Sequence, residues 1–380
     1  MDHAVGIDET APPTRGRRIL VLLTDAFGGH GGIALYNRDV LRALCEDPDT
    51  AEVVALPRLA RLPLSDLPEK LTFDVSALGG TIAYLRALGG QLMSNRPFDA
   101  VYCAHINLMP LAALAARILR VPLILAIYGI DAWERSPRRL VRAAVGRADR
   151  VLSISRITLD RFRSWQSYPE TVCALMPNAI HLDEFGIGTR DTALAARYGL
   201  DGHRVVMTFG RLAGNERYKG FDEVLEAMPA LIGQMPDIVY VIAGDGGDRG
   251  RLEEKAASLG ITDHVVFTGM VAEEEKAALY RLADAYVMPS RGEGFGFVLL
   301  EAMACGVPTI GSTLDGGREA LRDGMLGELV DPADRAALID AIVRALDKPK
   351  VIPAGLDYFA FPEFSRRLKD AIDRTLVGRR

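Results

Sequence analysis

The sequence predicts an α/β protein built from two doubly wound parallel sheets, and two observations support this. From Arg18 onward, short β-branched runs alternate with amphipathic helical stretches, the pattern of βαβ units whose parallel strands are buried on both faces. The chain has 380 residues, which is more than one hydrophobic core supports. We therefore expect two domains.

The expected strands form two groups. The first group comprises residues 18–25, 52–57, 98–104, 122–129 and 150–155, and the second comprises residues 204–211, 238–246, 264–269, 285–290 and 308–311. Between them, Pro177, Asn178 and the polar stretch 181–190 predict the interdomain linker. The expected divisions are a disordered extension at 1–15, domains at 16–183 and 184–357, and a C-terminal segment at 358–380 whose helix, residues 364–376, crosses back to the first domain.

Bulk properties exclude several classes of protein. The formal net charge of -5 argues against general nucleic-acid binding, which normally leaves an excess of Lys and Arg. Cys45, Cys103, Cys173 and Cys305 form no C-x-x-C pair, which favours reduced thiols in a cytoplasm. The first 15 residues have no apolar core of a secretory signal, and the longest apolar stretch, 121–130, is about half of a spanning helix. We expect a cytoplasmic protein with at most peripheral membrane contact.

The most informative stretch is SRGEGFGFVLLEAMACGVP, residues 290–308. It follows an expected strand, contains a glycine-rich turn and then begins a helix, whose free amides and partial positive charge suit a diphosphate. Glu293 precedes the turn, and Glu301 lies in the apolar helix, where a charge requires close hydrogen-bond donors such as sugar hydroxyls. A lone Glu301 is more often a solvated helix residue and a lone Glu293 a cap, but the combined pattern favours a ligand.

This stretch resembles the E-x7-E signature of retaining glycosyltransferases of family 4, which have the GT-B fold of two Rossmann-like domains facing a central cleft. Three further segments resemble family elements. They are GRLAGNERYKGFD at 210–222 (a phosphate clamp), AGDGGDRGRLE at 243–253 (a Gly-Asp-Gly turn) and MPNAIHLDEF at 176–185 (a linker).

The resemblance implies a role for each matching residue. Glu293 would accept hydrogen bonds from the transferred sugar, and Glu301 would accept them from the nucleotide ribose. Arg211 and Lys219 would hold the donor diphosphate, and both also follow an expected strand, where ligands of doubly wound sheets collect. The backbone would contact the donor at Gly244, Gly294, Phe295, Gly296 and Phe297. For Lys219 alone, a surface lysine is an equal alternative.

In the first domain, the segment GGHGGIALYN follows the first expected strand, and family members commonly carry a Gly-Gly pair there. Gly31 and Gly32 are therefore candidates for contact with the donor phosphate or the acceptor, and a plain tight turn is the alternative. The segment is not G-x-G-x-x-G, so a nicotinamide site is the weaker hypothesis.

One position departs from the family pattern. Many relatives have a His after the strand that enters the cleft, and this chain has Tyr128, whose hydroxyl would then have to bind the acceptor. His105 is a candidate to compensate, with a structural role as an equal alternative. Asp131 either orients the acceptor or caps the following helix.

The segment Arg135–Arg163 contains nine arginines and two aspartates, a net charge of +7. Basic clusters gain roughly 1 kcal/mol per charge near anionic lipid, so one hypothesis is peripheral docking that lets the cleft reach a lipid-linked acceptor. A solvated arginine-rich helix pair is an equal alternative.

Together these features predict a retaining hexosyltransferase that uses a nucleotide-diphosphate sugar. The RYKG and GGI elements resemble bacterial mannosyl- and hexosyltransferases of exopolysaccharide or lipopolysaccharide synthesis, which favours GDP-mannose first and a UDP-hexose second, with a glycan or polyprenyl-linked acceptor. No D-x-D metal site is convincing, because Asp47–Asp49 falls in an expected surface turn, so no metal cofactor is expected. The alternatives are a GT-B sugar-nucleotide epimerase, a phosphorylase-like enzyme and a non-catalytic nucleotide-sugar sensor.

Overall fold

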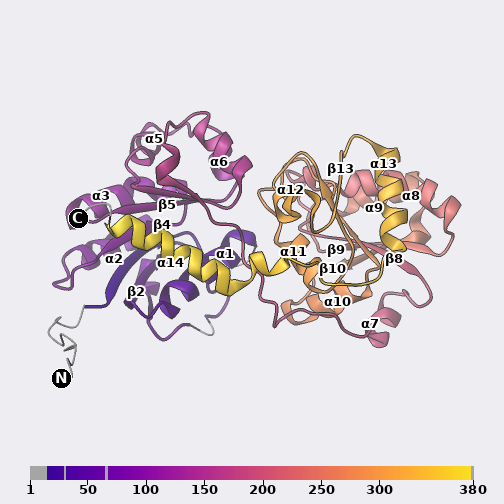
Figure 1. The fold of residues 1–380 in the computed structure, drawn as a ribbon, viewed down its shortest axis with the longest axis horizontal. Helices are drawn as coiled ribbons and strands as arrows, with labels where there is room; N and C mark the ends of the chain where they lie inside the picture. Colours follow the sequence, from indigo (N-terminus) through magenta and orange to yellow (C-terminus); the bar gives the residue numbers. More distant parts are fainter. Residues whose placement is uncertain (1–14, 30, 65–66, 378–380) are drawn as a thin grey trace, which may run out of the picture. The chain divides into compact units, whose positions relative to one another are not determined.

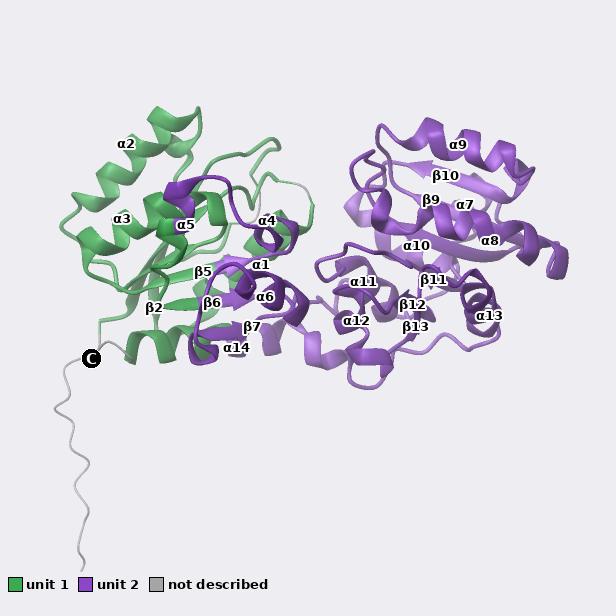
Figure 2. Cartoon of the chain, turned by 90° about the horizontal axis from the view of Figure 1, so that it is seen from above, with its two compact units in different colours: residues 1–125, 143–150, 368–380 green, residues 126–142, 151–367 purple. Residues whose placement is uncertain are grey.

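The computed structural model describes residues 15–29, 31–64 and 67–377. The expected N-terminal extension, residues 1–15, lies outside this part of the chain except for Arg15. The chain divides into two compact units (Figure 2). Unit 1 comprises residues 1–125, 143–150 and 368–380, and unit 2 comprises residues 126–142 and 151–367.

The first sheet has seven strands in the order β3-β2-β1-β4-β5-β6-β7, and its strands run parallel (Figure 1). The strands are β1 (Arg17–Leu23), β2 (Thr50–Pro57), β3 (Leu71–Phe73), β4 (Ala100–Cys103), β5 (Leu123–Ile127), β6 (Arg150–Ser153) and β7 (Cys173–Leu175). The five strands expected from sequence are confirmed. The two outermost strands, β3 and β7, have three residues each, too few to show a pattern.

The second sheet has six parallel strands in the order β10-β9-β8-β11-β12-β13. The strands are β8 (Arg204–Phe209), β9 (Ile238–Ala243), β10 (Val265–Gly269), β11 (Ala285–Val287), β12 (Thr309–Ser312) and β13 (Glu328–Val330). Strand order reverses between β8 and β11, as in a doubly wound sheet. The expected fold class, two Rossmann-like α/β sheets, is therefore confirmed. In the second sheet, the strand missed was the edge strand β13.

Helices lie between most successive strands of both sheets, and the described residues between β2 and β3 contain none. In the first half they are α1 (Gly32–Glu46), α2 (Thr81–Leu92), α3 (Met109–Leu119), α4 (Ile130–Trp133), α5 (Arg139–Val145) and α6 (Arg156–Arg163). In the second half they are α7 (Thr192–Arg197), α8 (Phe221–Gln234), α9 (Arg249–Ser258), α10 (Lys276–Leu282), α11 (Phe297–Ala304), α12 (Gly317–Ala320), α13 (Arg335–Leu346) and α14 (Phe361–Val377). Among the described residues, no helix combines the length and the hydropathy needed to cross a bilayer.

An apolar core packs against the second sheet. Helix α8 buries Val224, Leu225, Met228 and Leu231, whose spacing puts them on one helix face, against β8 and β9. Burying each such side chain contributes about 1.5–3 kcal/mol relative to its exposure. The strands are thereby fixed, and so are the turns at their carboxyl ends.

The C-terminal part of α14 belongs to unit 1 and is joined to it by ion pairs. Lys369 Nζ lies 3.2 Å from Asp47 Oδ1, and Arg17 Nη1 lies 2.5 Å from Asp373 Oδ1. The Asp47–Asp49 stretch is a surface turn, as expected, with Pro48 and Asp49 exposed. Asp47 itself is buried and also pairs with Arg17 at 3.6 Å. The domain boundaries at 183 and 357 stay predictions.

Two turns of the second sheet approach each other so closely that a side chain does not fit. Gly244 has φ +128°, and a Cβ built on it would lie 2.1 Å from the carbonyl oxygen of Gly210. This approach joins the turn after β9 to the turn after β8, where Gly210 N also donates to Ala243 O at 2.9 Å.

Replacing Gly244 with Ala is expected to destabilise the protein by more than about 2 kcal/mol, because the added Cβ meets backbone at a strained φ. The control is Gly233→Ala in α8, where a Cβ meets nothing within 4 Å. This control is expected to raise stability by up to about 1 kcal/mol. Urea unfolding measures both, and equal midpoints for the two variants would contradict the close approach.

Candidate functional site

The carboxyl ends of β8 and β11 carry the two turns that the sequence singled out. These strands are neighbours at the reversal of strand order, so the turn after β8 and the turn after β11 lie beside each other. Arg291 N donates to Tyr218 O at 2.8 Å. A Cβ on Gly292 would lie 2.9 Å from the Tyr218 ring, so only glycine fits this approach. The structure therefore brings the expected phosphate clamp against the expected sugar-binding turn.

Lys219 lies between two carboxylates in this region. Its Nζ is 3.5 Å from Glu293 Oε2 and 3.7 Å from Glu216 Oε2. Glu216 also forms an ion pair with Arg211, whose side chain is 71% exposed. Lys219 is thus a half-buried cation held by acidic partners, and the surface-lysine alternative is wrong. Sequence reasoning missed Glu216, because nothing in its spacing distinguishes it from a solvated loop residue.

Glu301 is buried, with only 5% of the residue exposed. Tyr280 Oη donates to Glu301 Oε2 at 2.7 Å, and Lys276 Nζ lies 3.5 Å from Glu301 Oε1. Burial raises the pKa of Glu301, and the Lys276 charge and the Tyr280 hydrogen bond act in the opposite direction. The solvated-helix alternative is therefore wrong. Tyr280 and Lys276 come from α10, and their i, i+4 spacing gave no sign that they meet this carboxylate.

Glu293 is fixed by a third turn, which follows β12. Glu293 N donates to Asp315 Oδ2 at 2.8 Å, and Gly316 N donates to Glu293 O at 2.9 Å. Sequence reasoning also missed Asp315, although its position just beyond an expected strand is a signal that points to this edge of the sheet.

The residues between the two glutamates present backbone to the site. Gly296 caps α11 with φ +97° and offers no side-chain cap. The Phe295 side chain is buried against Phe359, with ring centroids 5.5 Å apart, so it serves the core. Phe297 begins α11 and is half-buried. The expected contacts of Gly294, Phe295, Gly296 and Phe297 with a donor are therefore backbone contacts, and they stay predictions.

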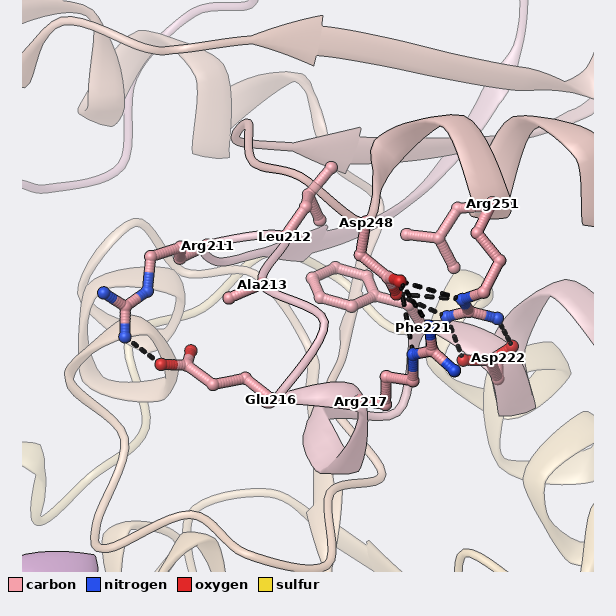
Figure 3. Close-up of a pocket in the computed structure, with 10 residues that line it drawn as sticks. Arg211, Leu212, Ala213, Glu216, Arg217, Phe221, Asp222, Asp248 and Arg251 are labelled. Atoms are coloured by element: carbon pink, nitrogen blue, oxygen red, sulfur yellow. Dashed lines mark hydrogen bonds and ion pairs between the residues drawn. The ribbon is translucent and has the colours of Figure 1, made fainter.

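Ion pairs wall a pocket on the other side of the β8 turn. Figure 3 shows Arg211 on one side of this pocket, reaching to Glu216, and Arg217 and Arg251 on the other side around Asp248. Arg251 makes a two-pronged contact with Asp222, at 2.7 and 2.8 Å, and lies 2.6 Å from Asp248. Burial alone would raise the pKa of Asp222, but the hydrogen bonds from Arg251 and Lys255 outweigh it and lower the pKa to about 2.

The candidates of the first half lie in separate local structures. Gly31 caps α1 with φ +91°, exposed and with nothing within 4 Å of a built Cβ, and Gly32 is the first helical residue. Their exposed backbone at a helix N-terminus fits an anion.

His105 and Asp131 both serve local backbone. His105 Nδ1 accepts from Asn107 N at 3.1 Å and so caps a short 3-10 helix, Ile106–Leu108. Burial lowers the pKa of His105, which keeps the ring neutral.

Asp131 Oδ1 accepts from Tyr128 N at 3.2 Å. Its Oδ2 is buried without a hydrogen-bond partner, and burial raises its pKa to about 7. Asp131 lies in the first turn of α4 (Ile130–Trp133), whose N-cap residue is Gly129, so Asp131 holds the Tyr128 backbone without being the cap of that helix. Whether these residues or the buried Tyr128 contact an acceptor stays a prediction.

Among residues 15–29, 31–64 and 67–377, no group of three or more His, Cys, Asp or Glu side chains is arranged to hold a metal ion. The four cysteines all lie in the described part of the chain and form no disulfide bond, and Cys45, Cys103 and Cys305 are buried.

Comparison with known proteins gives two kinds of match. Residues 30–184 match the family described as Glycosyltransferase Family 4, and residues 203–348 match Glycosyl transferases group 1. The chain is 33% identical over 272 residues to a GDP-mannose-dependent alpha-(1-6)-phosphatidylinositol monomannoside mannosyltransferase of Mycolicibacterium smegmatis, covering 68% of this chain and 70% of that protein. It is 30% identical to the alpha-D-kanosaminyltransferase of Streptomyces kanamyceticus, covering 77% and 80%. A phosphatidyl-myo-inositol mannosyltransferase of Mycobacterium leprae is 34% identical, covering 66% and 64%.

Among solved structures, Anabaena HepE in complex with UDP and glucose has a TM-score of 0.75 at 19% identity, covering 94% of this chain and all of that one. The lipopolysaccharide outer core galactosyltransferase WaaB has a TM-score of 0.70 at 18% identity, covering 94% and 99%. These likenesses show the fold.

The two Rossmann-like sheets and the paired turns define a glycosyltransferase with the GT-B fold. The chain belongs to glycosyltransferase family 4.

Replacing Arg251 with Ala is expected to destabilise the protein by about 1–3 kcal/mol at pH 7, because Asp222 and Asp248 lose a half-buried partner. The folded pKa of Asp222 is below its ordinary value, so this contribution is complete above about pH 4 and is lost as the pH falls towards 2. Denaturant unfolding at pH 7 and pH 3 measures both. The control is Arg318→Ala, whose pair with Asp323 is exposed and contributes less than about 0.5 kcal/mol.

Proposed function

We propose that this glycosyltransferase moves a hexosyl group from a nucleotide-diphosphate sugar to a glycan or lipid-linked acceptor, with retention of anomeric configuration, in bacterial cell-surface polysaccharide synthesis. The observation that carries the proposal is the contact between Lys219 and Glu293, 3.5 Å apart, which joins a cation for phosphate to a carboxylate for sugar. GDP-mannose is the first donor candidate, supported by the relative named GDP-mannose-dependent. A UDP-hexose is the second, supported by the fold shared with HepE, solved with UDP and glucose.

Four side chains of the site bind the donor. Arg211 and Lys219 bind the diphosphate and stabilise the charge that builds on it as the sugar leaves. Glu293 accepts hydrogen bonds from hydroxyls of the transferred sugar. Glu301 accepts them from the ribose, and its burial restricts it to ligands that bring donors. Two cationic side chains supply the electrostatic stabilisation that a metal ion gives elsewhere, so the reaction needs no metal.

The exposed surface of unit 1 supports a lipid-linked acceptor. Between residues 75 and 130, the only acidic residue is Asp99, and its carboxylate is paired with Arg15. Helices α2 and α3 pack side by side (Figure 2). Both expose large apolar side chains and arginines. These exposed apolar residues are Ile82, Leu85, Leu114 and Ile118. An apolar face with basic residues and one neutralised acid fits an anionic lipid surface.

The arginine-rich segment, residues 135–163, supplies a second basic surface, most of which belongs to unit 2. Arg142 donates to Ser136 O at 2.7 Å, Arg150 to Thr375 Oγ1 at 3.2 Å, and Arg161 stacks on Trp133, so these three serve local structure. Arg135, Arg138, Arg139, Arg147 and Arg156 are exposed. Leu140 beside them is 77% exposed. We place the enzyme in the cytoplasm, docked peripherally at the inner face of the cytoplasmic membrane.

Replacing Arg211 with Ala or Lys219 with Met is expected to lower kcat/KM for transfer from GDP-mannose by about 100-fold or more, because the leaving diphosphate loses a charge-assisted contact. The controls Arg335→Ala and Lys348→Met remove cations paired elsewhere and should leave the rate unchanged. EDTA should have no effect on the rate.

A thermal-shift panel of GDP-, UDP- and ADP-sugars identifies the donor, because a ligand of the native state raises Tm. Wild-type rates in both site variants would contradict the proposal, and ligand binding without product would favour a sensor.

The protein is expected to sediment with vesicles containing phosphatidylglycerol at low salt and to be released at high salt, because the attraction is electrostatic. Replacing both Arg138 and Arg139 with Ser should weaken the partition about 30-fold, at roughly 1 kcal/mol per charge. Leu114→Asp in α3 should also weaken the partition, and Val351→Asp, a similarly exposed apolar residue outside α2, α3 and the arginine-rich segment, is the matched control. Absence of sedimentation at low salt would refute docking.

A further inference from the structure

Asp315 is a buried carboxylate to which the sequence assigned no role. It lies in the turn after β12 and is 2% exposed. Its Oδ2 accepts from Ser290 Oγ at 2.7 Å and from Glu293 N at 2.8 Å, and its Oδ1 accepts from Gly317 N at 3.0 Å. The single side chain therefore joins the turn that carries Glu293 to the start of α12.

The backbone of Glu293 is held at both of its polar groups by this neighbouring turn. Besides the bond from its N–H to Asp315, its carbonyl oxygen accepts from Gly316 N at 2.9 Å. A Cβ on Gly316 would lie 2.0 Å from the Gly294 oxygen, so the two turns are in backbone contact. With its backbone anchored, the Glu293 carboxylate lies 3.5 Å from Lys219 and accepts from Gly294 N at 3.1 Å.

We propose that Asp315 is a positioning residue that fixes Glu293 for recognition of the transferred sugar, while the nucleotide is bound without its help. This inference rests on the proposed function, in which Glu293 meets the sugar and Glu301 the ribose. Glu301 is held by Tyr280 and Lys276 from α10. The hydrogen bonds of Asp315 reach a different set of groups, on Ser290, Glu293 and Gly317. Replacement of Asp315 is therefore expected to weaken binding of the sugar and to leave binding of the nucleotide unchanged.

The proton on Asp315 controls this arrangement. An ionised carboxylate only accepts, and two of its three partners are backbone N–H groups, which only donate. A protonated Asp315 has to donate from one oxygen, and Ser290 Oγ is the partner that can accept. Protonation of Oδ2 therefore reverses that hydrogen bond and weakens the contact with Glu293 N at the same oxygen. Recognition of the sugar then becomes dependent on pH.

The surroundings of Asp315 raise the pKa of its carboxyl group into a pH range that binding experiments can cover. Burial raises its pKa to about 6, the hydrogen bonds from Glu293, Ser290 and Gly317 act to lower it, and the charge of Glu293 adds to the increase. Tyr218, from the turn after β8, also faces the pair, and its own pKa is raised to about 12. On the turn of Asp315 itself, Arg318 is paired with Asp323. The folded pKa is above the ordinary value, so Asp315 takes up its proton as the pH falls through about 6.

The test compares the dissociation constants of GDP and GDP-mannose, and of UDP and UDP-glucose, by calorimetry between pH 5 and pH 8. In the wild type at pH 7.5, the nucleotide sugar is expected to bind more tightly than the nucleotide, and this gain should decrease at least about fivefold between pH 7.5 and pH 5. In Asp315→Asn, the gain should be about 10-fold smaller at pH 7.5 and independent of pH, with the Kd of the nucleotide within about twofold of wild type.

Two further variants test the role of Asp315 even if Asp315→Asn folds poorly. Ser290→Ala removes one of the three hydrogen bonds and should give an intermediate loss of the gain. Asp334→Asn is the matched control, because Asp334 likewise accepts from a backbone N–H, that of Ala337 at 2.9 Å, but serves as the cap of α13. It should leave the gain unchanged.

The outcomes separate the two proposals. A wild-type gain that persists in both Asp315→Asn and Ser290→Ala, or that does not change with pH, overturns the role of Asp315 alone. A wild type that binds no nucleotide sugar overturns the proposed function, and the role of Asp315 with it. Equal losses for the nucleotide and the nucleotide sugar in Asp315→Asn indicate a merely structural residue and also overturn the inference.

Discussion

The parallel pairing of β8 with β11, at the point where strand order reverses, is the constraint on which the site depends. It places Val206 beside Ala285 and Met207 beside Tyr286, so the turns that leave both strands emerge side by side. No helix separates them, and glycines at 292 and 316 allow their backbones to meet the neighbouring turns. The apolar core beneath the sheet therefore sets the spacing of Lys219 and Glu293, although neither side chain belongs to that core.

The buried carboxylates of the site reduce the stability of the folded protein when they are ionised. Burial raises the pKa of both Glu301 and Asp315, which means that the ionised form of each is less favourable in the folded protein than in water. Hydrogen bonds from Tyr280 to Glu301, and from Ser290 to Asp315, offset part of that cost. The network around Arg251 differs, because its hydrogen bonds outweigh burial and lower the pKa of Asp222. The carboxylates near this sheet edge therefore form two groups. Ionised Glu301 and Asp315 lower the stability of the fold, and ionised Asp222 raises it.

Much of the fold followed from local pattern. Long strands of the two sheets were expected correctly, because a strand buried on both faces is apolar along its length. The strands that were missed, β3, β7 and β13, have three residues each and too little sequence to show any periodicity. For the site, the glycine-rich turns and the charged residues after strands were found by their positions. The partners of those residues were not, because Glu216, Lys276, Tyr280 and Asp315 reach them from other turns and helices.

The sequence by itself determined the two α/β sheets, the glycine-rich turns and the family, because these depend on spacing along the chain. Only the tertiary structure decided which carboxylates are buried, which cations face them and which alternatives for Glu301 and Lys219 fail. The physical reason is that burial and pairing depend on neighbours contributed by distant segments. Asp315 and Glu293 are 22 residues apart in sequence, yet they share a hydrogen bond of 2.8 Å. Parallel strands that deliver their turns to one edge of a sheet create that proximity, and no local pattern encodes it.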